Sequence, residues 1–196
     1  MDFYEAVQKR RMVRNFTGEG VAQETVERML EAARRGPSAG FTQGQDFVVV
    51  TDEEKKAVIA ELCHEEGYVE AGFDPFLSRA PVLVIPCTNE NAYHRRYQEP
   101  DKVDEEGEEI EWPVPYWYMD VGAAVMILLL AVVEEGLAAA FVGSHRFPEI
   151  KRLLGIPQEV TPVGVIAIGH PAEDKRSDSL KRGRRVLRNV VHWEEW

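Results

Sequence analysis

The stretch WYMDVGAAVMILLLAVVEE, residues 117–135, decides the fold of this chain. It predicts a helix, because apolar side chains continue for thirteen residues from Val121 to Val133 without a charge or a proline. A helix that lacks a polar face must be covered on every side. Thirteen apolar residues are too few to span a bilayer. We therefore expect this helix at the domain centre or in a subunit interface.

Shorter helical and strand patterns lie on both sides of this helix. Asp2 with Glu5 resembles a capping box, and Gly36–Pro37 ends a second helical pattern. The patterns predict helices at residues 2–10, 22–35 and 148–154, an exposed helix at 53–66, a buried strand at 47–50, strands at 82–87 and 163–168, and a strand or turn at 138–142. No internal repeat or linker divides the chain, so residues 1–196 are expected to form one domain.

The composition limits the partners and the compartment. Acidic residues outnumber basic residues by 34 to 23, and a net charge of −11 disfavours binding to nucleic acid or to an anionic membrane. The first residues contain no apolar stretch of the secretory kind, and Cys63 and Cys87 form no C-x-x-C motif. We therefore expect free thiols in a reducing cytoplasm. The histidines lack metal-binding spacings, so no metal site is predicted. The motifs of hydrolases, P-loop proteins and Rossmann dehydrogenases are absent, which disfavours a Rossmann dehydrogenase, and no side chain stands out as a catalytic nucleophile.

Residues 89–116 interrupt the regular pattern and are expected to form a flap-like insertion. Eight carboxylates and one lysine lie between Glu99 and Glu111. A loop of this length is usually functional or disordered, and a block of like charges is usually a solvated surface. The aromatic residues in and beside this segment either cover a ligand or pack in the ordinary way: Tyr93, Tyr97, Trp112, Tyr116 and Trp117.

Basic residues gather at the two ends of this acidic chain. Four lie between Lys9 and Arg14, and seven lie between Lys175 and Arg188, which is eleven of the 23 in the chain. The fork of donors in an arginine matches the oxygen atoms of a phosphate. The two clusters could therefore converge on one phosphate, or on the phosphates of a nicotinamide cofactor. In the alternative, they pair with the surplus carboxylates or form a basic surface.

Two loops of small residues would let a backbone approach a flat ligand. The first is GPSAGFTQG at residues 36–44, where Ser38 and Gln43 supply hydrogen-bonding side chains. The second is FVGS at residues 141–144. Each loop alone is a weak signal, because such loops occur as ordinary turns in most domains.

Five motifs in register resemble the nitroreductase-like FMN oxidoreductases over nearly the whole chain. They are RRMVRNF at 10–16, AARRGPSAGFTQ at 32–43, DVGAA at 120–124 with EGL at 135–137, IGHP at 168–171, and RGRR at 182–185 followed by VVHW at 190–193. The resemblance implies an α+β fold with a central mixed or antiparallel sheet flanked by helices. It also implies a homodimer, with the long helix at the interface and a C-terminal tail exchanged with the partner subunit, where a strand could join the partner's sheet.

The resemblance further implies which residues bind the cofactor. The FMN phosphate and ribityl chain would contact Arg10, Arg11, Arg14, Arg182 and Arg184, with Met12 where the family usually has serine. The flavin ring would lie against Pro37, Ser38, Ala39 and Gly40, near Gln43, and against the turn formed by Phe141, Val142 and Gly143. In this family the arginine segments and the segment corresponding to Pro37–Gly40 come from different subunits, so the site needs two chains.

The activity implied by the resemblance is that of an FMN-dependent oxidoreductase. It would use NAD(P)H by a ping-pong mechanism to reduce a small, electron-poor substrate such as a nitroaromatic, a quinone or a flavin-like molecule. The alternative is a flavin-binding sensor, or a protein whose basic tail docks an acidic partner, without turnover. Reduction of the bound flavin by NAD(P)H, followed by reoxidation by an acceptor, distinguishes the two.

Overall fold

The structure is a computed structural model that describes residues 1–196. Strand β2 (Val82–Thr88) lies inside its sheet, and every residue of this strand is buried. The strands follow the order β1–β2–β5–β3, with β4 also paired to β2, and all of these pairs are antiparallel. The other strands are β1 (Gln45–Val50), β3 (Ala138–Val142), β4 (Thr161–Pro162) and β5 (Val165–Gly169). The expected α+β class with a central antiparallel sheet is therefore confirmed.

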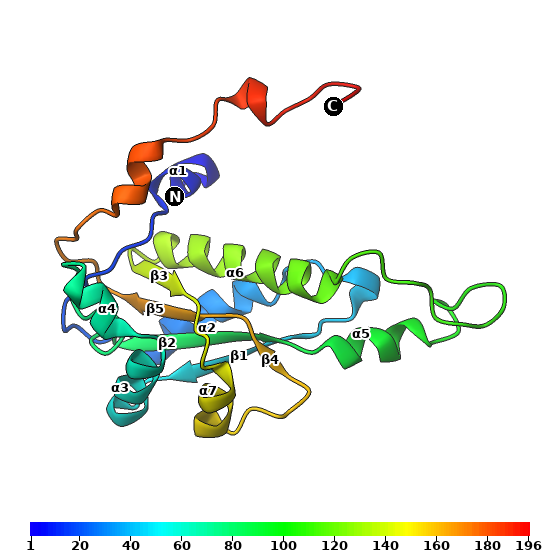
Figure 1. The fold of residues 1–196 in the computed structure, drawn as a ribbon, viewed down its shortest axis with the longest axis horizontal. Helices are drawn as coiled ribbons and strands as arrows, with labels where there is room; N and C mark the ends of the chain where they lie inside the picture. The colour runs from blue at the N-terminus through cyan, green and yellow to red at the C-terminus, as the bar shows by residue number, and fades with distance from the viewer.

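Helices cover both faces of this sheet (Figure 1). Helices α2 and α6 pack on one face, while α3 and α7 pack on the other. The α-helices are α1 (Phe3–Lys9), α2 (Gln23–Ala33), α3 (Glu53–Leu62), α4 (Glu65–Glu70), α5 (Glu90–Tyr97), α6 (Tyr116–Glu134) and α7 (Phe147–Leu154). Three short 3-10 helices are η1 (Ala39–Phe41), η2 (Asp178–Arg182) and η3 (Leu187–Asn189).

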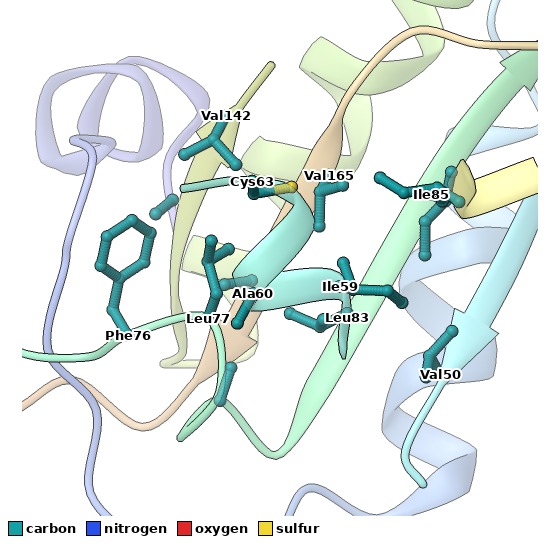
Figure 2. Packing of buried hydrophobic residues seen from close by; sticks show 14 of the residues in the cluster. Val50, Ile59, Ala60, Cys63, Phe76, Leu77, Leu83, Ile85, Val142 and Val165 are labelled. Atoms are coloured by element: carbon teal, nitrogen blue, oxygen red, sulfur yellow. The ribbon is translucent and has the colours of Figure 1, made fainter. Parts of the chain in front are cut away.

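The alternation of side chains along β2 divides the core into two layers. Leu83 and Ile85 belong to a cluster with α3 and α7, whereas Val82 and Val84 belong to a cluster with α2 and α6. Figure 2 shows the first of these layers, in which Ile59 of α3 is fully buried. Removing this apolar surface from water is the main force that holds the helices on the sheet.

Helix α6 covers the sheet with one face and leaves another face open. Ala124, Leu128 and Val132 are completely buried, whereas Tyr118 and Met119 are 47% and 59% exposed. By length and composition alone, α6 could cross a membrane, but the core helix of a folded domain meets the same criterion. Because α6 packs on α2, β2 and β3, its apolar sequence is explained by core packing on one side. Its open face is not covered within one chain.

Two predicted elements differ from the structure. The helix expected at 53–66 is divided into α3 and α4, because His64 has a left-handed backbone with φ of 56° that ends the first helix. This segment is also not simply exposed, since Ile59 and Leu62 of α3 are buried. The strand expected to be buried at 47–50 is an edge strand in which only Val50 is buried. An apolar run alone does not reveal that a strand has a neighbour on only one side.

The segment at 89–116 is not one continuous loop. Helix α5 occupies its beginning, and residues 98–115 then contain turns and irregular backbone until α6 begins. Helix α5 has the polar sequence ENAYHRRY, in which only Tyr93 is buried. A short helix with so little apolar pattern gives almost no periodic signal in the sequence.

The C-terminal tail leaves the sheet beside the N-terminal segment. Phe16 and Pro171 form an antiparallel bridge, and the N–H of Ala172 donates to the carbonyl of Asn15. The tail then passes α1 (Figure 1), and residues 178–196 are exposed. Residues 190–193 form no strand within one chain, so their addition to a partner's sheet stays a prediction.

Candidate functional site

The two basic ends of the chain meet around one cavity of about 390 Å³. Its wall contains no Asp or Glu, and its cationic members come from α1, the segment after it and the tail: Lys9, Arg10, Arg11, Arg14, Arg176 and Arg184. In a chain with a net charge of −11, a wall of cations without carboxylates creates a local positive potential. The cavity is therefore suited to an anion.

Asp174 holds the two ends of the chain together. Its side chain is only 2% exposed, and its carboxylate lies 2.8 Å from Nη1 of Arg11 and accepts the N–H of Arg14 at 3.1 Å. On the other side of this segment, the N–H of Val13 donates to the carbonyl of Ala139 at 2.9 Å. The segment is thus fixed between the edge of β3 and the start of the tail, which places its arginines in the cavity wall.

The arginines of the cavity leave donors available for an anion. The guanidinium carbon of Arg14 lies 5.2 Å from the centre of the Phe73 ring, and its buried Nε has no hydrogen-bond partner. A buried donor without an acceptor is costly. Arg10, Arg14, Arg176 and Arg184 form no ion pair with a carboxylate. The interpretation that the basic clusters pair with surplus acids applies to Arg11 but not to these four, and the donor set fits a phosphate.

Met12 connects the cavity with the turn after β3. Its Sδ accepts a hydrogen bond from the N–H of Phe141 at 3.3 Å, and Met12 pairs with Ala139 in a parallel bridge. Val142 is 4% exposed and its side chain belongs to the core, whereas Gly143 is exposed. The structure therefore brings the Arg10–Arg14 segment next to this turn, and only the backbone of Val142 can face a ligand.

The small-residue turn, residues 36–44, has an unusual backbone. Three of its residues have a positive φ between 54° and 59°: Gly40, Phe41 and Gln43. The N–H of Gln43 donates to Oγ of Ser38 at 2.9 Å, and the N–H of Ala39 donates to Oδ2 of Asp120 at 2.8 Å. Residues other than glycine rarely adopt such a conformation. Backbone held in this way by its surroundings is often shaped for a ligand.

The small-residue turn and α1 lie near opposite ends of α6 (Figure 1). The turn contacts Asp120 in the first part of α6, whereas the N-terminal amine of Met1 lies 2.7 Å from the carboxylate of Glu134 at the last turn of α6. Pro37 is exposed at the start of the turn. One chain therefore carries the small-residue turn apart from the predicted phosphate contacts, which lie beside the turn after β3. A site shared by two subunits requires this separation.

The tail residues that line the cavity differ from those that the resemblance implied. Arg182, a predicted phosphate contact, does not line it. Arg176 does line it; this residue belongs to the C-terminal basic cluster, but the resemblance did not name it. Arg182 is the last residue of η2, and Arg176 precedes that helix. Their placement depends on the path of the tail after Asp174 and on η2, which spacing in the sequence does not determine.

Three further contact residues were not predicted as site residues. Asp120 belongs to the DVGAA motif, and a single carboxylate inside an apolar helix is a signal for a buried hydrogen-bond partner. Asp174 gave no such signal, and neither did Arg96 of α5, whose Nε donates to the carbonyl of Gly40 at 3.0 Å. Each of the two stands among other charged residues in the sequence. No group of three or more His, Cys, Asp or Glu side chains lies close enough to hold a metal ion.

An acidic strap, residues 98–111, folds back on α5. Glu109 accepts a hydrogen bond from Nε1 of Trp112 at 2.6 Å and lies 2.6 Å from Nδ1 of His94. The Trp112 ring lies 4.4 Å from the ring of Tyr97, edge to face. Ordinary packing within the segment therefore accounts for these two aromatic rings.

The His94–Glu109 contact changes the charge state of both groups. The hydrogen bond with Glu109 raises the pKa of His94, and the nearby Glu90 adds to this effect. Burial alone would raise the pKa of Glu109, but hydrogen bonds from Trp112 and His94 lower it below the usual value. Both directions favour an ion pair between the strap and α5.

We expect the strap to loosen as the pH rises. Because the pKa of His94 is raised in the folded chain, its stabilising contact is complete below the ordinary value of 6.5 and is lost as the pH rises through the raised pKa. The contact is also lost as the pH falls from 4.5 through the lowered pKa of Glu109. Amide exchange of the strap, corrected for its intrinsic pH dependence, should therefore accelerate as the pH rises above 6.5. His94→Gln should abolish this extra acceleration, and an equal acceleration in both proteins would contradict the expectation.

A sequence model of the Nitroreductase family matches residues 7–170. The chain belongs to the Nitroreductase family. It is 30% identical to a Methanothermobacter thermautotrophicus protein named as an NADH dehydrogenase/NAD(P)H nitroreductase, over 100% of this chain and 88% of the relative. It is 29% identical to a Bacillus subtilis protein named FMN reductase (NAD(P)H), over 95% of this chain and 71% of the relative.

The solved structures confirm the fold of this nitroreductase-family chain. A nitroreductase family protein from Streptococcus pneumoniae matches it with a TM-score of 0.77 at 21% identity, over 98% of this chain and 100% of the other. The family and the fold that the five motifs indicated are therefore both confirmed.

Proposed function

We propose that this chain is an FMN-dependent oxidoreductase that takes electrons from NAD(P)H and passes them to a small, electron-poor acceptor. The observation that carries the proposal is the arginine-rich cavity at the junction of the two chain ends. The names of the relatives, an NAD(P)H nitroreductase and an FMN reductase, support the cofactor and the electron donor. They also support acceptors of nitroaromatic, quinone or flavin type.

The phosphate of FMN would be bound by arginines from both chain ends. Arg10, Arg14 and Arg184 are the main candidates, because no carboxylate in the chain competes for their donors. The unpaired Nε of Arg14 is a donor that an anion would satisfy. Arg11 would contribute its remaining donors beside Asp174.

Two serines of the tail extend this donor set. Met12 supplies no hydroxyl to the cavity, but Ser177 and Ser179 line the same wall. A serine hydroxyl can donate a hydrogen bond to a phosphate oxygen. We propose that these tail hydroxyls take the place of the serine that the family usually has at the position of Met12.

The flavin ring would lie between the small-residue turn of one subunit and the turn after β3 of the other. The proposed contacts are Pro37, Ser38, Ala39, Gly40 and Gln43 in the first turn, and Phe141, Val142 and Gly143 in the second. Bound FMN supplies a group that accepts a hydride and later gives up electrons. The residues of the chain hold that group and leave its face open, so donor and acceptor use the site in turn and ping-pong kinetics are expected.

The proposed site needs a second copy of this chain. Apolar side chains remain exposed on α1, α6 and the tail, among them Phe3, Tyr4, Met119, Leu187 and Trp193. Exposed apolar surface of this kind on one chain is typical of a protein interface. We propose a homodimer in which these surfaces are covered. The two buried, unpaired thiols support the expected cytoplasmic location.

A two-step flavin assay tests the proposed function. Purified protein loaded with FMN under anaerobic conditions should lose the visible absorbance of oxidised flavin when NADH or NADPH is added. A quinone or nitroaromatic acceptor should then restore the absorbance, and initial rates should give parallel double-reciprocal lines. Flavin that binds but is bleached by neither nucleotide would support the sensor instead. Failure to bind FMN would contradict the proposal as a whole.

A further inference from the structure

The small-residue turn is held from its buried side by one anion and one cation. Oδ2 of Asp120 in α6 accepts the N–H of Ala39 at 2.8 Å. Nε of Arg96 in α5 donates to the carbonyl of Gly40 at 3.0 Å. Ala39 and Gly40 are neighbours in the chain, so two adjacent residues are fixed by side chains from two different helices.

Asp120 has a second donor that keeps it in place. The hydroxyl of Tyr93 donates to the same Oδ2 at 2.8 Å, and the Tyr93 side chain is fully buried. Burial, together with the hydrogen bond to Asp120 and its charge, raises the pKa of Tyr93, so its hydroxyl stays protonated and remains a donor. A carboxylate that is 9% exposed requires such partners to be stable. The hydrogen bond from Tyr93 thus holds Asp120 in place as the acceptor for the N–H of Ala39 in the turn.

The rings of α5 approach the turn at its two glycines. A Cβ atom added to Gly40 would lie 2.7 Å from Cε2 of Tyr97, and one added to Gly44 would lie 2.5 Å from Cε2 of Tyr93. Both distances are shorter than any real contact of a Cβ atom, so α5 approaches as closely as glycine permits. Hydrogen bonds and ring contacts therefore restrict the turn along its whole buried side.

We infer that Asp120 and Arg96 are positioning residues for the small-residue turn, with Tyr93 supporting Asp120. The inference rests on the proposed function, in which this turn lies against the flavin ring. Both residues act through the backbone of the turn, by holding it in the conformation with positive φ at Gly40, Phe41 and Gln43. Arg96 also pairs with Asp101 at 2.7 Å, which joins the acidic strap to the turn.

The test compares Arg96→Ala with Arg95→Ala on the same helix. Arg96→Ala removes the donor to Gly40, whereas Arg95 is exposed and its side chain forms no hydrogen bond or ion pair. Loss of a hydrogen bond from a charged donor should weaken FMN binding about tenfold. It should also shift the visible spectrum of the bound flavin and accelerate amide exchange in residues 37–43. Arg95→Ala should match the parent protein, and Arg96→Lys should recover part of the affinity.

Asp120→Asn and Tyr93→Phe test the other anchor. Asp120→Asn should accelerate exchange at the N–H of Ala39 and weaken FMN binding, and Tyr93→Phe should do the same to a smaller extent. If Asp120→Asn does not fold, Arg96→Ala decides the question, because Arg96 is only partly buried. FMN affinity and spectrum in Arg96→Ala equal to those of Arg95→Ala would overturn the inference.

The outcome also separates this inference from the proposed function. If the parent protein binds no FMN, the proposed function fails, and amide exchange of residues 37–43 in the flavin-free chain still tests the anchors. Faster exchange in Arg96→Ala then supports the positioning role, and unchanged exchange overturns it.

Discussion

Replacing Arg10 and Arg184 together by alanine should weaken FMN binding by about 100-fold or more. The two arginines come from opposite ends of the chain and line the same cavity. A hydrogen bond to a charged group contributes about 1.5–3 kcal/mol, so the loss of two reduces affinity by the product of both effects. Quenching of flavin fluorescence during titration measures the change. Neither arginine forms an ion pair with a carboxylate in the chain, so the free energy of unfolding should change by less than about 0.5 kcal/mol per substitution.

Arg152→Ala is the matched control for the double variant. Arg152 is an exposed arginine of α7 and does not line the cavity, so its removal tests a general loss of positive charge. FMN affinity in this control should equal that of the parent protein. Each single variant at Arg10 or Arg184 should show an intermediate loss. Unchanged affinity in the double variant would remove the assignment of these residues to the phosphate.

Much of the fold could be predicted from apolar patterns. The long helix at 117–135 is α6 within one residue at each end, because an uninterrupted apolar run of that length fits a buried helix. The strands β2 and β5 were also predicted, since strands inside a sheet are buried on both faces. The edge position of β1 and the helix α5 were not predicted. Both depend on neighbours that are distant in the sequence rather than on the local pattern.

The candidate site was predictable only where residue type carries the chemistry. The two basic clusters were expected to converge on a phosphate because arginine suits that ligand, and the family resemblance implied Arg10, Arg14 and Arg184 in particular. The structure places all three in one cavity wall. The role of Asp174 could not be predicted, because it depends on the contact of its buried carboxylate with the N-terminal segment, which is distant in the sequence. For the same reason, the sequence did not predict that Arg176 lines the cavity in place of Arg182, since the contact of Asp174 sets the path of the tail.

The charged residues of this molecule form two regions, a cationic cavity and an acidic strap, with different roles. The cavity collects cations without carboxylates, whereas the acidic strap next to the small-residue turn is tied down by His94 and Arg96. In the proposed dimer, one region would bind the phosphate and the other would border the flavin ring. This division explains how a chain with a net charge of −11 can hold an anionic cofactor.

The affinity of the unmodified protein for FMN should exceed its affinity for riboflavin by about 100-fold or more. The two molecules share the flavin ring and the ribityl chain, and only FMN carries the phosphate. Arg10, Arg14 and Arg184 therefore have a charged partner in one ligand and none in the other. Equilibrium titration of flavin fluorescence under identical salt conditions measures both affinities.

The same comparison, repeated on the double variant Arg10→Ala with Arg184→Ala, tests most directly whether the two chain ends form a phosphate site. The difference between FMN and riboflavin should shrink to within about tenfold, because the variant loses FMN affinity while riboflavin affinity stays nearly constant. Equal binding of FMN and riboflavin by the unmodified protein, or an undiminished difference in the variant, would contradict the claim that the two chain ends form a phosphate site.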